Sequence, residues 1–308
     1  MAAFLPEGSL IHTPENEEAL SSPEAIQAAG RAGQILEGRA VVCDYDHNLV
    51  VELGCAQGII PREEGALGIR EGTTRDIAII SRVGKPVCFL PIQMETGEGR
   101  PRFLLSRRKV QQLCFDRYLS RLQPGEIIDC RVSHLEPFGC FVDLGCGLPS
   151  LIPIDSISVS RISHPADRFH PGQDIKAVVR SVEAGGRVTL THKELLGTWE
   201  ENAALFHSGE TVAGNVRSVE SYGIFVELTP NLAGLAEPCP GVRPGQHASV
   251  YIKSLIPEKM KVKLVIVDAF DARYPPAAPR YFLTHGRLDQ WRYSPPSSSR
   301  VVETVFGR

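Results

Sequence analysis

The stretch Cys140-Phe141-Val142-Asp143-Leu144-Gly145 decides the fold, because related versions of it occur at two other places in the chain. These are Leu49-Val50-Val51-Glu52-Leu53-Gly54 and Ile224-Phe225-Val226-Glu227-Leu228. A strand-like stretch precedes each version, and a Gly- or Pro-containing turn, an apolar run and a further alternating run follow it. The chain therefore contains one strand-rich unit of about 65 to 75 residues three times.

Short strands with alternating apolar and polar residues are typical of a small closed barrel, which leaves no strand edge unpaired. The composition agrees, because 28 Gly and 23 Pro in 308 residues favour turns over long helices. Helical spacing is found in Ser106 to Leu122 and in Lys193 to Phe206, between the units. We therefore predict a mainly β chain of tandem barrels joined by short helices, with Trp199 anchoring the second helix to a barrel.

The predicted organisation has seven parts. They are an acidic segment at 1–30, expected to be disordered, the first unit at 31–108, a linker helix at 109–122, the second unit at 123–194, a linker helix at 195–206, the third unit at 207–268 and a C-terminal extension at 269–308. In the extension, Arg280 to Thr284 and Val301 to Phe306 are rich in β-formers and should pair as a hairpin. A lone hairpin is marginal in water, so we expect Phe282, Trp291 and Phe306 to pack on the third unit.

Several classes of protein are disfavoured by the sequence. The first 30 residues contain five Glu and no Lys or Arg, unlike a secretory signal, and no apolar run approaches a membrane span. We expect a cytoplasmic protein without a membrane partner. The eight Cys form no CxxC pair, and the chain has no P-loop, GxSxG or HExxH motif. We therefore expect no enzyme activity, no cofactor and no metal.

Three stretches of the second unit together carry a family pattern. They are Phe138-Gly139-Cys140-Phe141-Val142-Asp143-Leu144-Gly145, Pro171-Gly172-Gln173-Asp174-Ile175 and Gly186-Arg187-Val188-Thr189-Leu190-Thr191-His192-Lys193. They resemble the RNA-binding repeat of small-subunit ribosomal protein S1. The third unit is similar through Tyr222-Gly223-Ile224-Phe225-Val226-Glu227-Leu228, and the first through Val51-Glu52-Leu53-Gly54 and Gln57-Gly58-Ile59-Ile60-Pro61.

The resemblance implies five-stranded OB-type barrels that bind single-stranded RNA. The whole chain is similar to a short, Gram-positive-type member of that family with three repeats. This implies an mRNA-binding protein of translation, with the first unit docking on the small ribosomal subunit by analogy. The alternative is a non-ribosomal regulator of mRNA stability or translation. The family's acidic and Arg positions fall on Glu183 and Arg187, whereas Pro153 and Glu237 occupy the places of its His.

Strand alternation gives an independent reason for RNA binding. It sends Val142 and Leu144 inward and Phe141 and Asp143 outward, so Phe141 is an aromatic ring presented to solvent. Phe138 should lie on the same side if Gly139 hosts a bulge or a bend. Two adjacent rings form a platform on which bases stack. Tyr222 and Phe225 repeat the pattern, and ordinary core packing is the alternative role for all four rings.

Charge contributes less, because no unit is strongly basic and the net charge is −3. Basic residues and one further aromatic ring accompany the platforms. The predicted RNA-binding residues are Phe138, Phe141, Arg131, Lys176, Arg180, Glu183 and Arg187 in the second unit and Tyr222, Phe225, Arg217, Tyr251 and Lys253 in the third. In the extension, Arg292 and Tyr293 are RNA-contact candidates, with a purely structural cap as the alternative. His47 and Val50 occupy the platform positions of the first unit, which we therefore expect not to bind RNA.

Overall fold

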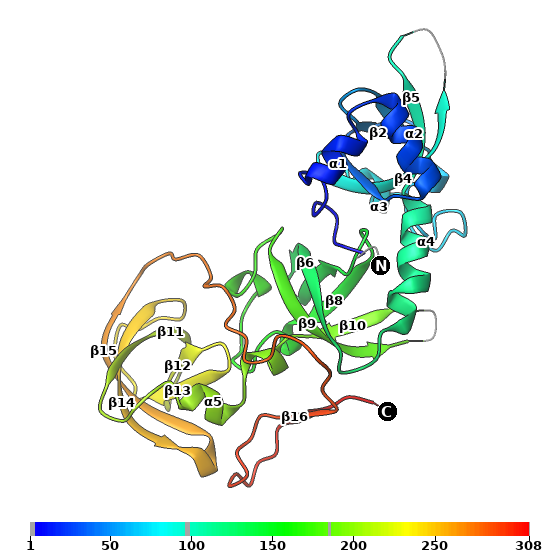
Figure 1. The fold of residues 1–308 in the computed structure, drawn as a ribbon. Coiled ribbons are helices and arrows are strands. Elements are labelled where there is room, and N and C mark those ends of the chain that lie inside the picture. Colours follow the sequence, from blue (N-terminus) through cyan, green and yellow to red (C-terminus); the bar gives the residue numbers. More distant parts are fainter. Residues whose placement is uncertain (1–3, 96–98, 184–185, 308) are drawn as a thin grey trace. The chain divides into compact units, whose positions relative to one another are not determined.

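The computed structural model describes residues 4–95, 99–183 and 186–307. Contacts divide the chain into two compact units, which we call unit 1 (Met1–Arg121 with Asp143–Pro149) and unit 2 (Leu122–Val142 with Ser150–Arg308). These two units differ from the three sequence repeats, which we call barrels 1, 2 and 3 from here on. In the described part, the chain forms three closed five-stranded barrels and a two-stranded sheet after the third (Figure 1). The predicted mainly β architecture of tandem barrels with a C-terminal hairpin is confirmed.

The three barrels share one topology. In barrel 1 the strand order is β1-β2-β3-β5-β4, with β3 and β5 parallel and β4 closing on β1. Barrels 2 and 3 repeat this order and this parallel pair. The strands of barrel 1 are β1 (Leu36–Cys43), β2 (Leu49–Glu52), β3 (Gln57–Ile60), β4 (Pro86–Glu95) and β5 (Arg102–Ser106). Five strands in this arrangement make an OB-type barrel.

Barrels 2 and 3 have strands of similar length. Barrel 2 contains β6 (Ile127–Glu136), β7 (Gly139–Asp143), β8 (Pro149–Pro153), β9 (Asp174–Val182) and β10 (Val188–Thr191). Barrel 3 contains β11 (Thr211–Glu220), β12 (Gly223–Thr229), β13 (Leu232–Ala236), β14 (His247–Ile256) and β15 (Lys261–Phe270). In β14 the buried Ala248, Val250 and Ile252 alternate with outward residues, as a half-buried strand requires.

Short helices connect and cover the barrels. The α-helices are α1 (Pro14–Ala19), α2 (Pro23–Ala32), α3 (Ile77–Ile80), α4 (Arg107–Arg117) and α5 (Trp199–Ala203). Single 3₁₀ turns are η1 (Arg62–Glu64), η2 (Leu119–Arg121), η3 (Ile154–Ser156), η4 (Pro165–Asp167), η5 (Lys193–Leu196) and η6 (Pro257–Lys259). Between η5 and α5, Gly197 interrupts the second linker with φ +85°. Trp199 is 2% exposed and packs in the core of unit 2, so its predicted anchoring role is confirmed.

The prediction that residues 1–30 are disordered is wrong for the part that the structure describes. The side chains of Thr13 and Ser22 cap α1 and α2, and each helix begins with Pro. Ile26 of α2 is fully buried in the core of unit 1. This segment folds because its apolar residues complete the core around barrel 1.

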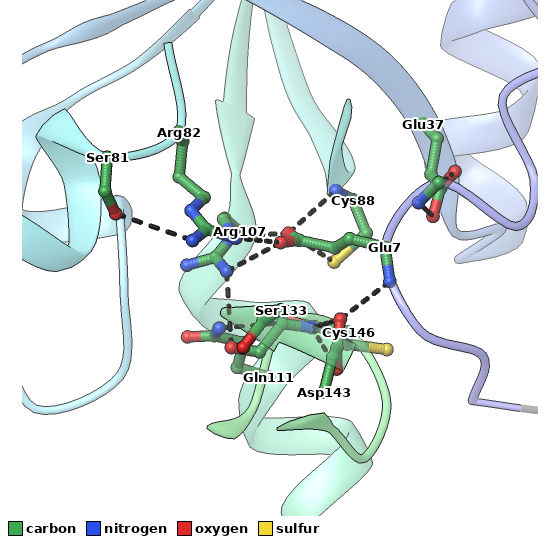
Figure 2. A network of polar contacts seen from close by, with 12 residues as sticks. Glu7, Glu37, Ser81, Arg82, Cys88, Arg107, Gln111, Ser133, Asp143 and Cys146 are labelled. Carbon is green, nitrogen blue, oxygen red and sulfur yellow. Dashed lines mark hydrogen bonds and ion pairs between the residues drawn. The ribbon is translucent and has the colours of Figure 1, made fainter. Parts of the chain in front are cut away.

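A buried polar network holds the segment before α1 (Figure 2). Glu7 accepts hydrogen bonds from Nε and Nη2 of Arg107 at 2.6 and 3.0 Å and from the backbone N–H of Cys88, and Nη1 of Arg82 lies 3.3 Å away. Burial alone would raise the pKa of Glu7, but the charge and hydrogen bonds of Arg107, aided by Arg82, hold it below its usual value. Glu7 is therefore an ionised, buried attachment point.

Asp143 belongs to the same network and is covered rather than exposed to solvent. Its side chain is buried, and the carboxylate accepts backbone hydrogen bonds from Glu7, Gly145 and Gly147 at 2.8 to 3.1 Å. Burial raises the pKa of Asp143 to about 6. Alternation placed Asp143 outside the barrel correctly, but the segment that covers it comes from 136 residues earlier in the chain.

In unit 2, a charge cluster connects barrels 2 and 3. Glu227 of β12 accepts hydrogen bonds from Arg168, which follows η4, and from Arg217 of β11. Nη1 of Arg217 also lies 3.2 Å from Asp167. Fully buried Asn231 adds to this contact by accepting from the N–H of Val159. The two barrels of unit 2 are therefore held together by buried polar groups.

The C-terminal extension forms a hairpin of β16 (Gln290–Arg292) and β17 (Glu303–Val305). Trp291 and Phe306 are buried in the core cluster that includes barrel 3, as predicted, whereas Phe282 is half-buried. The predicted strand at Arg280 to Thr284 is wrong, because the N–H of Phe282 bonds to the carbonyl of Leu195 and its ring packs on Gly197. The extension packs on the rest of unit 2.

Candidate nucleic-acid interface

In barrel 2, two predicted aromatic rings lie side by side on the surface. Phe138 occupies the tight turn between β6 and β7 and is 56% exposed, and Phe141 follows on β7 and is half-buried. Their ring centroids are 6.0 Å apart and the rings are nearly perpendicular, at 86°. Core packing is therefore excluded for Phe138, and the pair presents apolar ring surface to solvent.

Barrel 3 repeats this arrangement with a different first residue. Tyr222 lies in the turn between β11 and β12 and is 65% exposed, and Phe225 on β12 is half-buried. The two centroids are 6.2 Å apart at an interplanar angle of 88°. The same edge-to-face geometry thus occurs at equivalent positions of two barrels.

The glycine between the two rings lies where the backbone of another strand approaches closely. The chain turns at Pro137 and Phe138, and β7 begins at Gly139. A β-carbon on Gly139 would lie 2.6 Å from the carbonyl oxygen of Ile152, and one on Gly223 would lie 2.6 Å from that of Ala236. Glycine is required here because the neighbouring strand approaches too closely for any side chain.

Three of the predicted basic residues are held by carboxylates. Nε of Arg131 lies 2.6 Å from Asp174, and Nζ of Lys176 lies 2.6 Å from Asp129. Both pairs bridge β6 and β9 on the half of β6 that is remote from the turn with Phe138. Arg217 is bound by Glu227, as described above. All three cations therefore already have carboxylate partners.

The other predicted residues lie on exposed parts of the barrels. Arg180 is exposed on β9 and donates to the hydroxyl of Ser156 at 3.0 Å. Glu183 and Arg187 are exposed and close the turn between β9 and β10 through the N–H of Glu183 and the carbonyl of Arg187. Tyr251 on β14 is 40% exposed, and Nζ of Lys253 lies 3.7 Å from Glu237.

Barrel 1 has no aromatic pair at the equivalent positions. His47 adopts a left-handed backbone conformation with φ +62°, and its Nδ1 lies 3.5 Å from Asp76. Val50 pairs across the sheet with Val42, which is 51% exposed. Tyr45, which we did not predict, is 99% exposed at the tip of the β1–β2 turn. It is flanked by Asp44 and Asp46, an acidic setting that disfavours phosphate.

Tyr293 of the extension does not take the RNA-contact role considered for it. It is 7% exposed and its hydroxyl donates to the carbonyl of Asn231. The extension therefore offers no stacking surface at Tyr293, and the structural alternative applies to this residue.

A known protein family matches the barrel that carries Phe138 and Phe141. The family described as "S1 RNA binding domain" matches residues 121–193, which contain all of barrel 2. Barrel 2 is thus similar to the S1 RNA-binding domain, and the match covers about a quarter of the chain.

The S1 relatives include small-subunit ribosomal proteins. The chain is 31% identical over 182 residues to small ribosomal subunit protein bS1 of Staphylococcus aureus, covering 54% of this chain and 46% of that protein. It is 28% identical over 240 residues to the bS1 homolog of Bacillus cereus, covering 72% and 60%. The match thus spans less than two thirds of either relative.

A solved multidomain protein with nucleic-acid-binding domains from Streptococcus pneumoniae is 15% identical, and the match covers 76% of this chain and 73% of that one. Its TM-score of 0.25 is too low for a comparison of domain arrangement.

One residue of the S1 barrel was missed from the sequence. The ring of His134 on β6 lies parallel to Phe141, with centroids 4.3 Å apart and an interplanar angle of 8°. Phe141 follows His134 by seven residues, and Phe225 follows its cross-strand partner Ser218 by the same number. This shared offset identifies His134 once the strand register of barrel 3 is known.

Across residues 4–95, 99–183 and 186–307, no helix has the length and apolar character needed to cross a membrane. In the same ranges, no three or more His, Cys, Asp or Glu side chains are grouped so that they could hold a metal ion.

Proposed function

We propose that this protein binds single-stranded RNA, and mRNA in particular, during translation in the cytoplasm. The observation that carries the proposal is the recurrence of one solvent-facing, edge-to-face aromatic pair on two barrels, at 6.0 Å and 86° in barrel 2 and 6.2 Å and 88° in barrel 3. Packing within a core does not require such a pair, because the inward positions are filled by Val142 and Val226.

Stacking supplies most of the affinity in this proposal. Each base stacked on an aromatic ring contributes about 1 to 3 kcal/mol with little preference for sequence. Phosphate neutralisation contributes less, because Arg131, Lys176 and Arg217 already bind carboxylates. We therefore expect weak sequence preference and a shallow dependence of affinity on salt.

The S1 family supports an RNA ligand for barrel 2, and the bS1 relatives support a role at the small ribosomal subunit. Barrel 1 lacks the aromatic pair, and Asp44, Asp46 and Asp76 surround its first turn. We assign barrel 1 to docking on the small subunit rather than to RNA binding.

Two measurements on the full chain test the function. Fluorescence anisotropy with a labelled, unstructured pyrimidine-rich RNA should give saturable binding. An unlabelled duplex of the same length should not displace the labelled RNA. Tagged protein should sediment with small ribosomal subunits at low salt. RNA binding without sedimentation would favour a free regulator of mRNA stability or translation, and failure to bind single-stranded RNA would contradict the proposal.

A further inference from the structure

The aromatic surface of barrel 2 contains a third ring. His134 stacks flat on Phe141 at 4.3 Å and 8°, whereas Phe138 meets Phe141 edge-on at 6.0 Å and 86°. His134 and Phe138 are both exposed, and Phe141 beneath them is half-buried. One face of Phe141 is therefore already occupied by an imidazole ring.

The orientation of His134 is fixed by its neighbours. Its Nδ1 lies 3.3 Å from the hydroxyl of Ser133, and that hydroxyl also bonds to the backbone carbonyl of Phe141 at 3.0 Å. The ring is thus tied to both strands that form the surface. A ring held in place loses little conformational entropy when a ligand stacks on it.

The register of the sheet explains why His134 lies on this surface. In barrel 3, β11 is irregular between Val216 and Ser218, and Ser218 pairs directly with Phe225. The offset of seven residues is the same between His134 and Phe141. His134 and Ser218 therefore occupy equivalent positions, and barrel 3 has a hydroxyl where barrel 2 has an aromatic ring.

We propose that His134, rather than Phe141, offers the outer face on which an RNA base stacks in barrel 2, so that base, His134 and Phe141 form a three-layer stack. This rests on the proposed function and adds a residue that makes the two RNA platforms unequal. A base cannot reach the occupied face of Phe141 unless His134 moves away. Barrel 2 is then the stronger of the two platforms, because Ser218 offers no flat ring to extend Phe225.

The test uses the full chain with Tyr222→Ala and Phe225→Ala, so that barrel 2 alone provides a platform. The probe is fluorescein-labelled oligouridine of about 12 nucleotides, long enough for one OB barrel. His134→Leu removes the flat ring while it keeps apolar volume, and we expect roughly tenfold weaker binding. His134→Phe restores the ring and should bind within about twofold of the parent.

A reciprocal variant tests the same idea in barrel 3. Ser218→His in a chain with Phe138→Ala and Phe141→Ala should tighten oligouridine binding, by building the three-layer stack on Phe225. Circular dichroism must show an unchanged fold for each variant. His134 and Ser218 are not in the barrel core, so both changes should be tolerated.

The outcomes separate this inference from the proposed function. If His134→Leu binds as tightly as the parent or more tightly, while Phe138→Ala with Phe141→Ala weakens binding, His134 is a cover over Phe141 and the inference is wrong. If neither aromatic pair matters for binding, the proposed function fails and the inference fails with it.

Discussion

Arg168 places its Nη2 atom 2.6 Å from Oε2 of Glu227, and these side chains are only 8% and 3% exposed. Arg168 comes from the loop of barrel 2 and Glu227 from β12 of barrel 3. The same carboxylate also binds Arg217. One carboxylate therefore binds two guanidinium groups where the barrels of unit 2 meet.

Changing Glu227 to Gln should strongly destabilise unit 2. Removing one partner of a buried ion pair typically costs about 3 to 5 kcal/mol, because the other charge stays buried. Arg168→Met should cost less, because Glu227 keeps Arg217. Urea unfolding followed by tryptophan fluorescence measures this, since the chain's two tryptophans, Trp199 and Trp291, are both buried in unit 2.

The matched control is Asp271→Asn. Asp271 pairs with Arg243 in unit 2, but the two side chains are 73% and 68% exposed, so the loss should be close to zero. Equal losses of unfolding free energy in Glu227→Gln and Asp271→Asn would show that the buried cluster stabilises unit 2 no more than an exposed ion pair does.

His192 should make unit 2 sensitive to acid. It is 1% exposed, its Nδ1 lies 2.9 Å from the carbonyl oxygen of Ile157, and burial lowers its pKa to about 4 from an ordinary 6.5. A lowered histidine pKa gives stability that is present above pH 6.5 and is lost as the pH falls toward 4. The shift corresponds to about 3 kcal/mol.

We expect His192→Phe to flatten the dependence of the unfolding free energy on pH between 6.5 and 4, measured by urea titration at several pH values. His207, which is exposed in the loop before β11, provides the control variant His207→Phe. A wild-type pH slope in His192→Phe would mean that other groups cause the acid sensitivity.

Glu7 should stabilise the segment that precedes α1. Glu7→Gln leaves Arg107, which is 2% exposed, without its carboxylate, and the expected loss is again about 3 kcal/mol or more. Hydrogen exchange should then quicken at the amides of Gly8, Leu10 and Ile11, which Glu37 holds in the wild type.

The control for Glu7→Gln is Glu17→Gln on the exposed side of α1. It should leave the exchange rates of these amides unchanged. Rapid exchange of the same amides in the wild-type protein would contradict the ordered segment described here.

Trp291 should anchor the C-terminal hairpin. Trp291→Ala removes a ring that is 5% exposed, and such a loss costs about 3 to 5 kcal/mol. Val305→Ala on the facing strand, where Val305 is 66% exposed, should cost little. Urea unfolding followed by Trp199 fluorescence compares the two, and RNA affinity below the transition should be unchanged in both. A loss of affinity in Trp291→Ala with the fold intact would mean that the hairpin contacts RNA.

The barrels and the aromatic pairs could be predicted because they depend on local pattern. Alternation around Val142 and Val226 determines which residues face inward, and an aromatic residue at the preceding position must face outward. The turn residues Phe138 and Tyr222 stand next to a glycine that the neighbouring strand requires. These signals lie within a few residues of one another.

The errors have long-range causes. Composition alone predicted a disordered N-terminal segment, because the residues that stabilise it are distant in sequence. Asp143 accepts a hydrogen bond from Glu7, and Glu7 pairs with Arg107, 100 residues further on. Its helix signals were local and readable, because Thr13 and Ser22 each precede a Pro. His134 was missed because the cross-strand partner of Phe141 depends on strand register, which the local pattern does not give; in barrel 3 an irregularity in β11 places Ser218 opposite Phe225.

RNA stacking on barrels 2 and 3 is tested most directly by the dissociation constant of a fourfold variant, Phe138→Ala, Phe141→Ala, Tyr222→Ala and Phe225→Ala, for unstructured pyrimidine-rich RNA. With the circular dichroism spectrum unchanged, we expect binding to weaken by at least about a hundredfold, because each stacked base contributes about 1 to 3 kcal/mol. Barrel 1, which is intact in this variant, should not rescue it. A dissociation constant equal to that of the wild type would contradict RNA binding through these rings.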